Sequence, residues 1–410
     1  MIAQVGFSSN FITTEIQISG SKSESNRLLI LKSLYPNLTI KNLSISDDTK
    51  VLLAALEKMD GEIDVHHAGT AMRFLTAFFS FKEGVTVVLT GSKRMQERPI
   101  KILVNSLREM GANITYLKNE GYPPLRIIGK EPQQNTVNIA ANVSSQYISA
   151  LLLVASSLKN GLTITLQGEI TSTPYIKMTL QLLQQIGLDS TFDGNTISLL
   201  PVSKIPQKTI TVESDWSSAS YFYSIISLVK GASVTLKSYK RESLQGDSAL
   251  SEIYSKLGVV TTINDTENSI TLSNNHKAIS EKIELDLSNT PDIAQTIAVT
   301  CLGLAIPCLL TGLHTLKIKE TDRIVALKIE LEKLGARVIV TDNSLELFPE
   351  PSLNKNVLID TYNDHRMAMA FAPLSSKVPL QINEPMVVTK SYPNFWKHLQ
   401  KIGFLVDFKE

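Results

Sequence analysis

The chain has 410 residues, and its 40 Lys and Arg almost balance its 39 Asp and Glu, which gives a formal net charge of +1 at pH 7. A chain of this length exceeds one ordinary hydrophobic core, so we expect two or more domains. This balanced charge gives no indication of binding to nucleic acid or to an anionic membrane, because proteins that bind either carry an excess of clustered basic residues. A hydrophobic content of 43% argues against a disordered chain.

The N-terminal stretch MIAQVGFSSNFITTEI lacks a basic region followed by an apolar run, so we expect no secretory signal. The most apolar window, residues 293–312, contains Gln295 and Pro307, and we predict a buried helix that runs into a strand rather than a membrane span. Cys301 and Cys308 lie in this window and are predicted to be buried thiols. Together these features favour a cytoplasmic protein.

Six polar clusters, each followed by an apolar helix, recur along the chain. They begin near positions 21, 68, 144, 217, 291 and 364, and after the first gap they lie about 73 residues apart. In chain order the segments are SKSESNRLLILKSL, HAGTAMRFLTAFF, VSSQYISALLLVASSL, SSASYFYSIISLV, TPDIAQTIAVTCLGL and NDHRMAMAFAPL. Because each helix is apolar almost all round, we predict that it is buried.

A second helix type alternates with the first; it is amphipathic and ends at a glycine followed by an extended run. Its copies are ILVNSLREMGANITYL, TLQLLQQIGLDSTF, LSEIYSKLGVVTTI, LKIELEKLGARVIV and FWKHLQKIGFLVDF, with VLLAALEKMDGEIDV as a looser sixth. The glycine indicates a left-handed helix cap. Runs such as GVTVVLTG and GLTITLQG indicate strands between the two helix types.

Six copies of one α/β unit predict an α/β fold of two inside-out lobes, resembling an inverse α/β barrel, with three repeats, buried helices and outer sheets in each lobe. We place the first lobe at 21–213 and the second at 1–20 plus 214–410, because the strand EIQIS lies outside the first repeat and completes the later lobe. Hinges are expected near 20–21 and 213–214. Each lobe should collect three helix N-termini at one surface, an arrangement that favours anions.

The residues at these helix starts admit two interpretations. Ser and Asn side chains there are typical of ordinary N-caps, at Ser21, Ser144, Ser217 and Asn363. Capping does not explain the cations in or near the first turns, where positive charge is unfavourable without a bound anion: Lys22, Arg27, Arg73 and Arg366. We therefore expect an anion site, and we expect the loss of Lys22 or Arg323 to harm activity far more than stability.

Three further segments carry charge: GSKRMQERPI, IKETDRIVAL and VVTKSYPNFW. They place cations and acids in loops or helix starts at Arg94, Arg98, Lys319, Glu320, Asp322, Arg323 and Lys390. Taken singly, Glu320 and Asp322 could serve the helix dipole and Arg323 could pair with Asp322 on the surface. Taken together, the cations favour one anionic ligand site. The spacing of the His, Cys, Asp and Glu residues indicates no metal site, and no dinucleotide or P-loop motif is present, so Asp292 and Glu320 are the acid–base candidates.

Nine segments follow one another in an order shared with a known family: GSKSESNR, AGTAMR, RMQERP, VSSQYISALL, STPYI, PDIAQT, KETDR, NDHRMAMA and TKSYPNFW. Over nearly its full length the chain resembles 5-enolpyruvylshikimate-3-phosphate synthases. The resemblance implies two inside-out lobes with shikimate 3-phosphate and phosphoenolpyruvate bound between them. It implies transfer of the enolpyruvyl group to the 5-hydroxyl through a tetrahedral intermediate, on the shikimate pathway to chorismate, in a monomer that needs no cofactor.

The resemblance also implies roles for individual residues. Asp292 would take the 5-hydroxyl proton, Glu320 would handle the proton at the enol methylene, and Lys22 would touch both substrates. Contacts to shikimate 3-phosphate are implied for Lys22, Ser23, Arg27, Ser144, Ser145, Gln146, Ser172, Tyr175, Asp292, Thr315 and Lys319. Contacts to phosphoenolpyruvate are implied for Lys22, Gly69, Arg94, Gln146, Arg323, Arg366 and Lys390.

Three positions depart from the family pattern: His67 and Thr315 where Asn is usual, and Phe74 where Pro is common. They put hydroxyl contacts and a pocket wall in doubt rather than the reaction. The nearest alternative is the sister enzyme that transfers enolpyruvyl to UDP-N-acetylglucosamine, but the loop TGSKRMQERP lacks that family's reactive Cys or Asp. A repeat scaffold or an RNA-end-processing relative would not need this set of cations, and an RNA partner would favour a basic surface.

Overall fold

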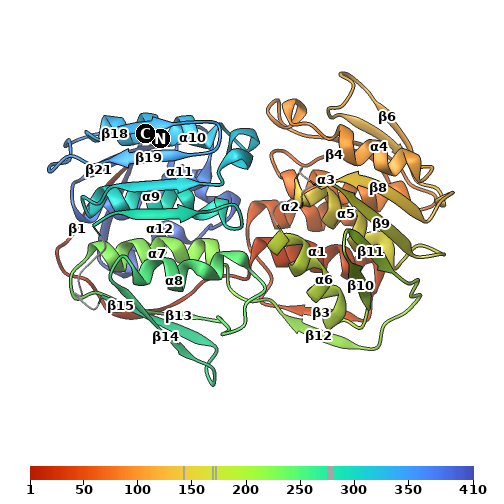
Figure 1. Cartoon of the computed structure of the whole chain (residues 1–410), viewed down its shortest axis with the longest axis horizontal. Helices are drawn as coiled ribbons and strands as arrows, with labels where there is room; N and C mark the ends of the chain where they lie inside the picture. Colours follow the sequence, from red (N-terminus) through yellow and green to blue (C-terminus); the bar gives the residue numbers. More distant parts are fainter. Residues whose placement is uncertain (142–143, 169, 171–172, 275–280) are drawn as a thin grey trace. The chain divides into compact units, whose positions relative to one another are not determined.

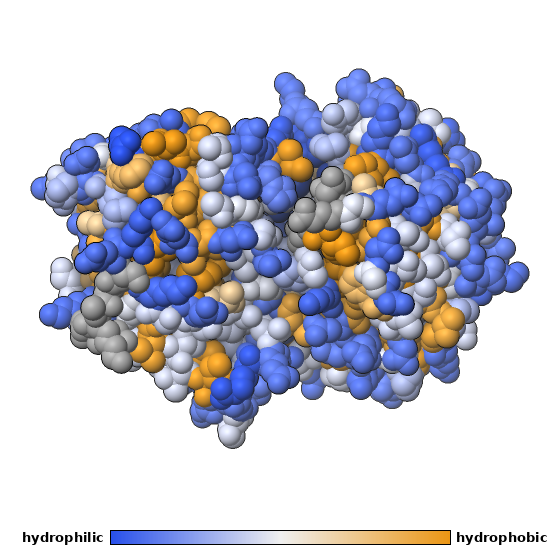
Figure 2. Space-filling model, in the orientation of Figure 1, coloured by the Kyte–Doolittle hydropathy of each residue, from blue (hydrophilic) through white to orange (hydrophobic). Residues whose placement is uncertain are grey.

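The computed structural model describes residues 1–141, 144–168, 170, 173–274 and 281–410. Contacts divide the chain into two compact units (Figure 1). The continuous unit comprises Gly20–Val212, and the discontinuous unit comprises Met1–Ser19 with Glu213–Glu410. Figure 2 shows hydrophilic side chains over much of the face of each unit, interrupted by apolar ones.

The continuous unit alternates buried helices with amphipathic ones. Its helices are α1 (Lys22–Leu34), α2 (Asp47–Leu56), α3 (Gly69–Ser80), the 3-10 helix η1 (Met95–Glu97), α4 (Lys101–Glu109), α5 (Ser145–Ala155) and α6 (Thr173–Gln185). Its strands are β3 (Leu38–Lys41), β4 (Asp60–Asp64), β5 (Thr86–Thr90), β6 (Asn113–Tyr116), β7 (Leu125–Ile128), β8 (Thr136–Ala140), β9 (Leu162–Gln167), β10 (Ser190–Asp193), β11 (Thr196–Leu199) and β12 (Lys208–Thr211). They form sheets in the orders β4-β5-β7-β6, β10-β11-β9-β8 and β12-β3.

The discontinuous unit repeats this plan. Its helices are α7 (Trp216–Leu228), η2 (Gly246–Ala249), α8 (Leu250–Ser255), η3 (Pro291–Ile293), α9 (Ala294–Gly303), η4 (His314–Ile318), α10 (Arg323–Lys333), α11 (His365–Phe371), η5 (Ala372–Ser376), η6 (Pro385–Lys390) and α12 (Phe395–Lys401). Its strands are β1 (Ile2–Phe7), β2 (Thr14–Gln17), β13 (Ser233–Lys237), β14 (Val259–Asn264), β15 (Ser269–Asn274), β16 (Ile283–Asp286), β17 (Cys308–Thr311), β18 (Arg337–Val340), β19 (Leu345–Phe348), β20 (Leu358–Ile359), β21 (Leu380–Asn383) and β22 (Phe404–Lys409). The sheet orders are β20-β21-β1-β22, β14-β15-β13-β2 and β16-β17-β19-β18.

Two strands lie outside the repeat to which their chain position assigns them. In four repeats, the strand before the buried helix pairs in parallel with the strand after it, as β4 does with β5 across α3. Strand β2 precedes α1 but pairs with β13 of the discontinuous unit, while β12 precedes α7 but pairs with β3 of the continuous unit. The exchange of β2 and β12 takes the chain from one unit to the other twice. The hinges expected at these crossings stay a prediction.

The first helix type is buried, as the sequence predicts. In α3, α5 and α7 every residue is buried except the second one: Thr70, Gln146 and Ser217. The body of each helix is therefore sealed and its N-terminal end is open. Burial of the helices beneath outer sheets confirms the predicted inside-out α/β class.

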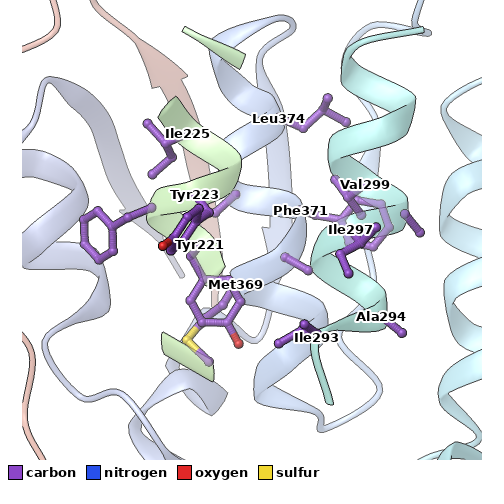
Figure 3. Close-up of a cluster of buried hydrophobic side chains, with 14 of the residues drawn as sticks. Tyr221, Tyr223, Ile225, Ile293, Ala294, Ile297, Val299, Met369, Phe371 and Leu374 are labelled. Carbon is purple, nitrogen blue, oxygen red and sulfur yellow. The ribbon is translucent and has the colours of Figure 1, made fainter. Parts of the chain in front are cut away.

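The core of the discontinuous unit is built where α7, α9 and α11 meet. Figure 3 shows Tyr221, Ile297 and Phe371 reaching into this region from the three helices, and all three side chains are fully or almost fully buried. Burying one such side chain stabilises the fold by about 1.5–3 kcal/mol. A hydroxyl pair links α9 to α7, since Thr300 Oγ1 donates to Ser224 Oγ at 2.8 Å. This packing fixes the helix starts that build the candidate site.

Local predictions differ in outcome. Ser21 and Ser144 are the N-caps of α1 and α5, as predicted. The predicted caps at Ser217 and Asn363 are wrong, because Asp215 caps α7 and Asp364 caps α11. In both places a carboxylate lies within two residues and accepts from first-turn N–H groups more strongly than a neutral side chain.

The apolar window forms α9 followed by β17, which confirms the predicted helix and strand. Cys301 and Cys308 are free and buried, as predicted. Among the residues that the structure describes, no helix has the length and apolar character needed to cross a membrane.

The glycines that end the amphipathic helices have positive φ, at Gly111, Gly187, Gly258, Gly335 and Gly403. This confirms the predicted left-handed caps. At Gly335 (φ 103°) a Cβ would meet no atom closer than 3.6 Å, so substitution there tests the backbone alone.

We expect Gly335→Ala to lower the free energy of unfolding by about 1–2 kcal/mol, because an L-residue is strained in this conformation. Urea denaturation measures the change. Gly6→Ala is the matched control in the same unit, since a Cβ there meets nothing within 4 Å and φ lies outside the left-handed region. Equal midpoints for the two variants would contradict the assignment.

Candidate active site

The discontinuous unit gathers three carboxylates around one buried guanidinium. Arg323, the first residue of α10, is 2% exposed. Its Nε lies 2.6 Å from Asp364 Oδ2, its Nη1 lies 3.0 Å from Asp292 Oδ1, and its Nη2 lies 2.8 Å from Glu320 Oε2. Burial alone would lower the pKa of Arg323, but the carboxylates of Asp364, Glu320 and Asp292 outweigh it and raise that pKa. Arg323 is therefore a fixed cation that joins three separate segments.

Asp292 lies among three cations. It belongs to η3, which leads into α9, and Pro291 precedes it at the first helical position. Its Oδ2 is 3.1 Å from Arg366 Nη2, and its Oδ1 is 3.6 Å from Lys319 Nζ. Burial raises the pKa of Asp292, but Arg366, Lys319 and Arg323 outweigh it and hold the pKa well below its usual range. The carboxylate is ionised and surrounded by donors.

Glu320 and Lys390 complete the cluster. Lys390, the last residue of η6, is buried, and its Nζ lies 3.6 Å from Glu320 Oε1. Glu320 precedes the helix rather than starting it, because α10 begins at Arg323 and Asp322 is its N-cap. Asp322 accepts from Ile324 N at 3.2 Å, which confirms dipole capping for this acid. Glu320 instead faces the cations.

A short hydrogen-bond chain extends from this cluster to a further acid. Arg366 Nη2 donates to Ser217 Oγ at 3.3 Å, and Ser217 Oγ donates to Asp247. Burial, followed by repulsion from Asp292, raises the pKa of Asp247 to about 6. The starts of α7, α9 and α11 thus meet through Ser217, Asp292 and Arg366, as expected from the repeat.

The N-terminal end of α1 carries a charged pair. Lys22 Nζ lies 3.2 Å from Asp48 Oδ2, and the Lys22 side chain is 20% exposed. Ser23 follows Lys22 and is half-buried. Lys22 therefore reaches the open end of a buried helix, where an anion would be attracted.

Arg27 lies deeper in the same helix and is 2% exposed. Its guanidinium donates to Thr179 Oγ1 at 2.7 Å, Ser149 Oγ at 3.0 Å and the carbonyl oxygens of Ser23 and Tyr175. Burial lowers the pKa of Arg27 to about 10. The sequence argument that cations near helix starts imply a bound anion is therefore wrong as a general rule, because neutral oxygens of the protein satisfy this guanidinium. Its contact with substrate stays a prediction.

The starts of α3 and α5 also lie together. Gln146 Nε2 lies 3.2 Å from Thr70 Oγ1. Ser144 caps α5 and Ser145 is its first residue, so both are at this open end. Tyr175, at the start of α6, is half-buried. Ser172 lies outside the described residues.

Arg94 and Gly69 are both in the continuous unit. Arg94, just before η1, is 46% exposed and pairs with Glu97 at 3.5 Å. Gly69 is the first residue of α3 and is buried. Arg73 Nη1 donates to the carbonyl of Gly69 at 3.2 Å and its Nη2 donates to the carbonyl of Pro99 at 3.0 Å, so Arg73 ties the loop to the helix.

The departures from the family pattern lie in different settings. Phe74 is buried, and its ring centroid is 5.5 Å from the guanidinium carbon of Arg27. The Thr315 hydroxyl is buried and has no hydrogen-bond partner within the described ranges. His67 is exposed. Phe74 thus supports Arg27, a contact that proline would not supply.

Sequence reasoning missed Asp48, Asp247 and Asp364. Asp364 was missed because the pattern of helix starts favoured its neighbour Asn363 as the cap. The signals available were the aspartates in SISDD and LQGDS, which lie at the starts of amphipathic helices rather than of the apolar helices from which the site was predicted. In the part of the chain that the structure describes, no three His, Cys, Asp or Glu residues are arranged to hold a metal ion.

Comparison with known proteins decides the family. The model of the family described as EPSP synthase (3-phosphoshikimate 1-carboxyvinyltransferase) matches residues 60–399. This chain belongs to the EPSP synthase family. The membership confirms the resemblance inferred from the nine sequence segments.

Curated relatives of the family cover nearly the full length. A 3-phosphoshikimate 1-carboxyvinyltransferase of Bacteroides fragilis (strain YCH46) is 47% identical over 397 residues, which cover 96% of each chain. One of Sulfurovum sp. (strain NBC37-1) is 36% identical over 423 residues, which cover 96% of this chain and 97% of the relative.

Solved structures share the fold. EPSP synthase from Acinetobacter baumannii matches with a TM-score of 0.79 at 20% identity, covering 100% of both chains. The enolpyruvyl transferase NikO from Streptomyces tendae matches with a TM-score of 0.74 at 13% identity, covering 100% of this chain and 99% of that one. At these identities the comparison supports the inside-out fold alone.

The surroundings of Arg323 revise the expectation that its loss spares stability. We expect Arg323→Met to lower the free energy of unfolding by about 3–5 kcal/mol, because it leaves buried carboxylates without their cation. Urea or thermal denaturation measures the loss. Arg241→Met is the control: its pair with Asp265 is 60% exposed on both sides and should contribute little. Similar losses in the two variants would show that the buried cluster is not a stability determinant.

Asp247 should make stability depend on pH. Its folded pKa of about 6 lies above the ordinary 3.8, so between these values the folded protein keeps a proton that the unfolded chain has lost. This contribution therefore falls as pH rises from about 4 to 6, by up to about 3 kcal/mol. Asp247→Asn should remove it, so the variant gains stability relative to the wild type across this window in thermal melts. A pH-independent difference would refute the shift.

Proposed function

We propose that this chain transfers the enolpyruvyl group of phosphoenolpyruvate to the 5-hydroxyl of shikimate 3-phosphate, giving 5-enolpyruvylshikimate 3-phosphate and phosphate. Membership of the EPSP synthase family supports this, as do the names of relatives that cover 96% of the chain. The observation that carries it is the cluster of Arg323, Arg366, Lys319 and Lys390 with the two partly buried carboxylates of Asp292 and Glu320.

The charges of the cluster suit a substrate with several anionic groups. Guanidinium groups bind carboxylate and phosphate through paired N–H donors, and lysines add point charges. Arg366, Lys319 and Lys390 have side chains that are 11%, 25% and 5% exposed, so Lys319 is the most accessible of the three. We propose that Arg323, Arg366 and Lys390 hold phosphoenolpyruvate and that Lys319 and Thr315 face shikimate 3-phosphate.

The continuous unit would supply the remaining contacts. Lys22, Gly69, Arg94 and Gln146 are proposed for phosphoenolpyruvate, because they lie at or near open helix starts. Proposed contacts to shikimate 3-phosphate are Lys22, Ser23, Arg27, Ser144, Ser145, Gln146, Ser172 and Tyr175. Of these, Arg27 already donates to Ser149 and Thr179. It can bind substrate only if an anionic group of the ligand reaches this buried guanidinium.

The proposed chemistry is an addition followed by an elimination. The 5-hydroxyl oxygen bonds to the central carbon of phosphoenolpyruvate, its proton leaves, and a proton adds to the methylene carbon. Loss of phosphate with a proton from the resulting methyl group then restores the double bond. The oxidation state is unchanged overall, so the reaction needs no redox partner.

Asp292 and Glu320 are the proposed acid–base residues, with Lys22 beside the reacting phosphate. The pKa of Asp292 is held low by Arg366, Lys319 and Arg323, which makes it a weak base in the unliganded protein. Substrate anions that bind the same cations would weaken this effect and raise its basicity. Glu320 lies between Arg323 and Lys390, so the same exchange would release it for proton transfer.

We further propose that the enzyme is a cytoplasmic monomer of the pathway to chorismate and aromatic amino acids, and that the two units hinge near residues 20–21 and 213–214. Solution scattering with shikimate 3-phosphate and an unreactive phosphoenolpyruvate mimic tests the hinge through the radius of gyration. An unchanged radius would count against it.

Phosphate release from phosphoenolpyruvate tests the activity. Shikimate 3-phosphate should support turnover, whereas UDP-N-acetylglucosamine and unphosphorylated shikimate should not. Turnover with the nucleotide sugar in place of shikimate 3-phosphate would assign the chain to the sister activity.

Asp292→Asn and Glu320→Gln should lower turnover by roughly 10²–10⁴-fold while shikimate 3-phosphate still binds. Calorimetry measures binding, and phosphate release measures turnover. Asp322→Asn is the matched control from the same loop, because Asp322 accepts from the first-turn N–H groups of Ile324 and Val325 and asparagine also caps a helix. Near-normal turnover of either acid variant would remove that residue from the mechanism.

A further inference from the structure

Glu330, in helix α10, is a buried acid that the proposed chemistry does not use. Its side chain is 0% exposed. Its Oε1 accepts from Tyr362 Oη at 2.6 Å, and its Oε2 accepts from Asp360 N at 3.2 Å. Lys333 Nζ lies 2.8 Å from Oε2 and balances the charge of the carboxylate. Glu330 thus joins α10 to the segment that precedes α11.

The backbone of this segment is left-handed at two successive residues. Tyr362 and Asn363 have φ of 53° and 55°. They are the central residues of a turn that Asp364 N closes by donating to Thr361 O at 2.8 Å. Asparagine tolerates this conformation, but tyrosine is strained in it, and glycine would form the same turn without strain. Such a strained residue persists only where its surroundings hold it, and the hydrogen bond from the Tyr362 hydroxyl to Glu330 does so.

The turn leads directly into the candidate active site. Asp364 follows it, with Oδ2 lying 2.6 Å from Arg323 Nε and Oδ1 accepting from Arg366 N at 2.9 Å. Arg366 Nη1 then donates to the main-chain carbonyl of Asp292 at 2.9 Å. A rotation of the turn would therefore move an ion pair, a helix cap and the start of α11 together.

Helix α10 holds this segment at two points. Arg323 and Glu330 are seven residues apart, so they lie on one face of the helix, about 10 Å apart along its axis. Arg323 pairs with the carboxylate of Asp364. Glu330 holds the side chain of Tyr362 and the main chain of Asp360. Because a helix is rigid over two turns, the two contacts together fix both the position and the direction of the turn.

We propose that Glu330 is a positioning residue for phosphoenolpyruvate binding: by holding the left-handed turn at Tyr362, it places Arg366 at the start of α11. This rests on the proposed function, in which Arg323 and Arg366 hold that substrate. Glu330 acts through the turn and does not itself contact the substrate. Donors that are already in place bind a ligand without the cost of ordering them, so loosening the turn weakens phosphoenolpyruvate binding in particular.

Tyr362→Phe tests the proposal, because it removes only the hydroxyl that contacts Glu330. KM for phosphoenolpyruvate should rise about 3–10-fold, whereas kcat and KM for shikimate 3-phosphate should stay within about twofold of the wild-type values. Glu330→Gln removes the charge and one acceptor oxygen, so it should raise the same KM by at least as much. Variants that melt at a lower temperature but keep both KM values would show that Glu330 only stabilises the fold, and they would overturn the proposal.

Tyr223→Phe is the matched control. Tyr223 is a buried tyrosine of α7 in the same unit, and its hydroxyl lies 2.8 Å from Thr261 Oγ1. The variant therefore loses a hydroxyl contact of similar length away from the turn, and KM for both substrates should be unchanged. If KM for phosphoenolpyruvate rose as much as in Tyr362→Phe, the loss of any buried hydroxyl would disturb the site, and the specific role of Glu330 would be refuted.

Calorimetric titration with phosphoenolpyruvate, in the presence of shikimate 3-phosphate, separates this inference from the proposed function. Binding that is weaker by about threefold or more in Tyr362→Phe supports the role of Glu330, whether or not the wild type turns over. Equal binding in the variant and the wild type overturns it. A wild type that binds phosphoenolpyruvate but releases no phosphate with shikimate 3-phosphate would instead overturn the proposed function.

A stability cycle tests the coupling independently of activity. Tyr362→Phe should lower the melting temperature of the wild type. In an Asp364→Asn background it should lower it less, because the turn then no longer holds a carboxylate against Arg323. Tyr223→Phe, whose hydroxyl contacts Thr261 instead, should have the same effect in both backgrounds. Additive effects of Tyr362→Phe and Asp364→Asn would show that the turn does not place Asp364, and they would contradict the proposal.

Discussion

The arrangement of the discontinuous unit depends on the ion pairs of Arg323. Its three partners come from separate parts of the chain: Asp364 caps α11, Asp292 leads into α9, and Glu320 precedes α10. Removing one partner from a buried ion cluster leaves a charge that water cannot reach, which is far more costly than losing a surface pair. The ion pairs therefore fix the starts of α9, α10 and α11 relative to one another, and the polar groups at these helix starts have a defined geometry.

The pairing of these cations with carboxylates of the protein itself has a chemical consequence. The carboxylates that hold the cations in place also occupy the donors that an anionic substrate would use. Arg366 serves Asp292 through both its carboxylate and its main-chain carbonyl, whereas the longer Lys319 and Lys390 contacts are 3.6 Å. In the proposed function, a bound anion would compete for these two lysines through such longer contacts. In the proposed mechanism, the reactivity of Asp292 would then depend on whether substrate is bound, because each cation drawn toward substrate would no longer hold its pKa low.

Much of the fold follows from local patterns in the sequence. Apolar helices and glycine caps are encoded within one or two turns, so the left-handed backbone conformation of Gly335 could be predicted. Polar contacts between residues far apart in the sequence could not be predicted in this way. The cations near helix starts looked equivalent, yet Arg27 donates to Ser149 and Thr179, which lie more than a hundred positions away, while the Nε of Arg98 is buried with no hydrogen-bond partner among the described residues. Asp364 was missed for the same reason, since its partner Arg323 belongs to another repeat.

The exchange of β2 and β12 makes the continuous unit an insertion, and the N-terminal strand β1 lies between β21 and β22 at the other end of the chain. A ribosome therefore completes all of Gly20–Val212 before it makes most of the discontinuous unit. During that time β1 and β2 have no partners, and the sheet that contains β1 closes only when the last strand, Phe404–Lys409, has emerged. Assembly in the cell is thus ordered by topology: the inserted unit can fold during synthesis, whereas the unit that carries Arg323 must wait until β22 has been made.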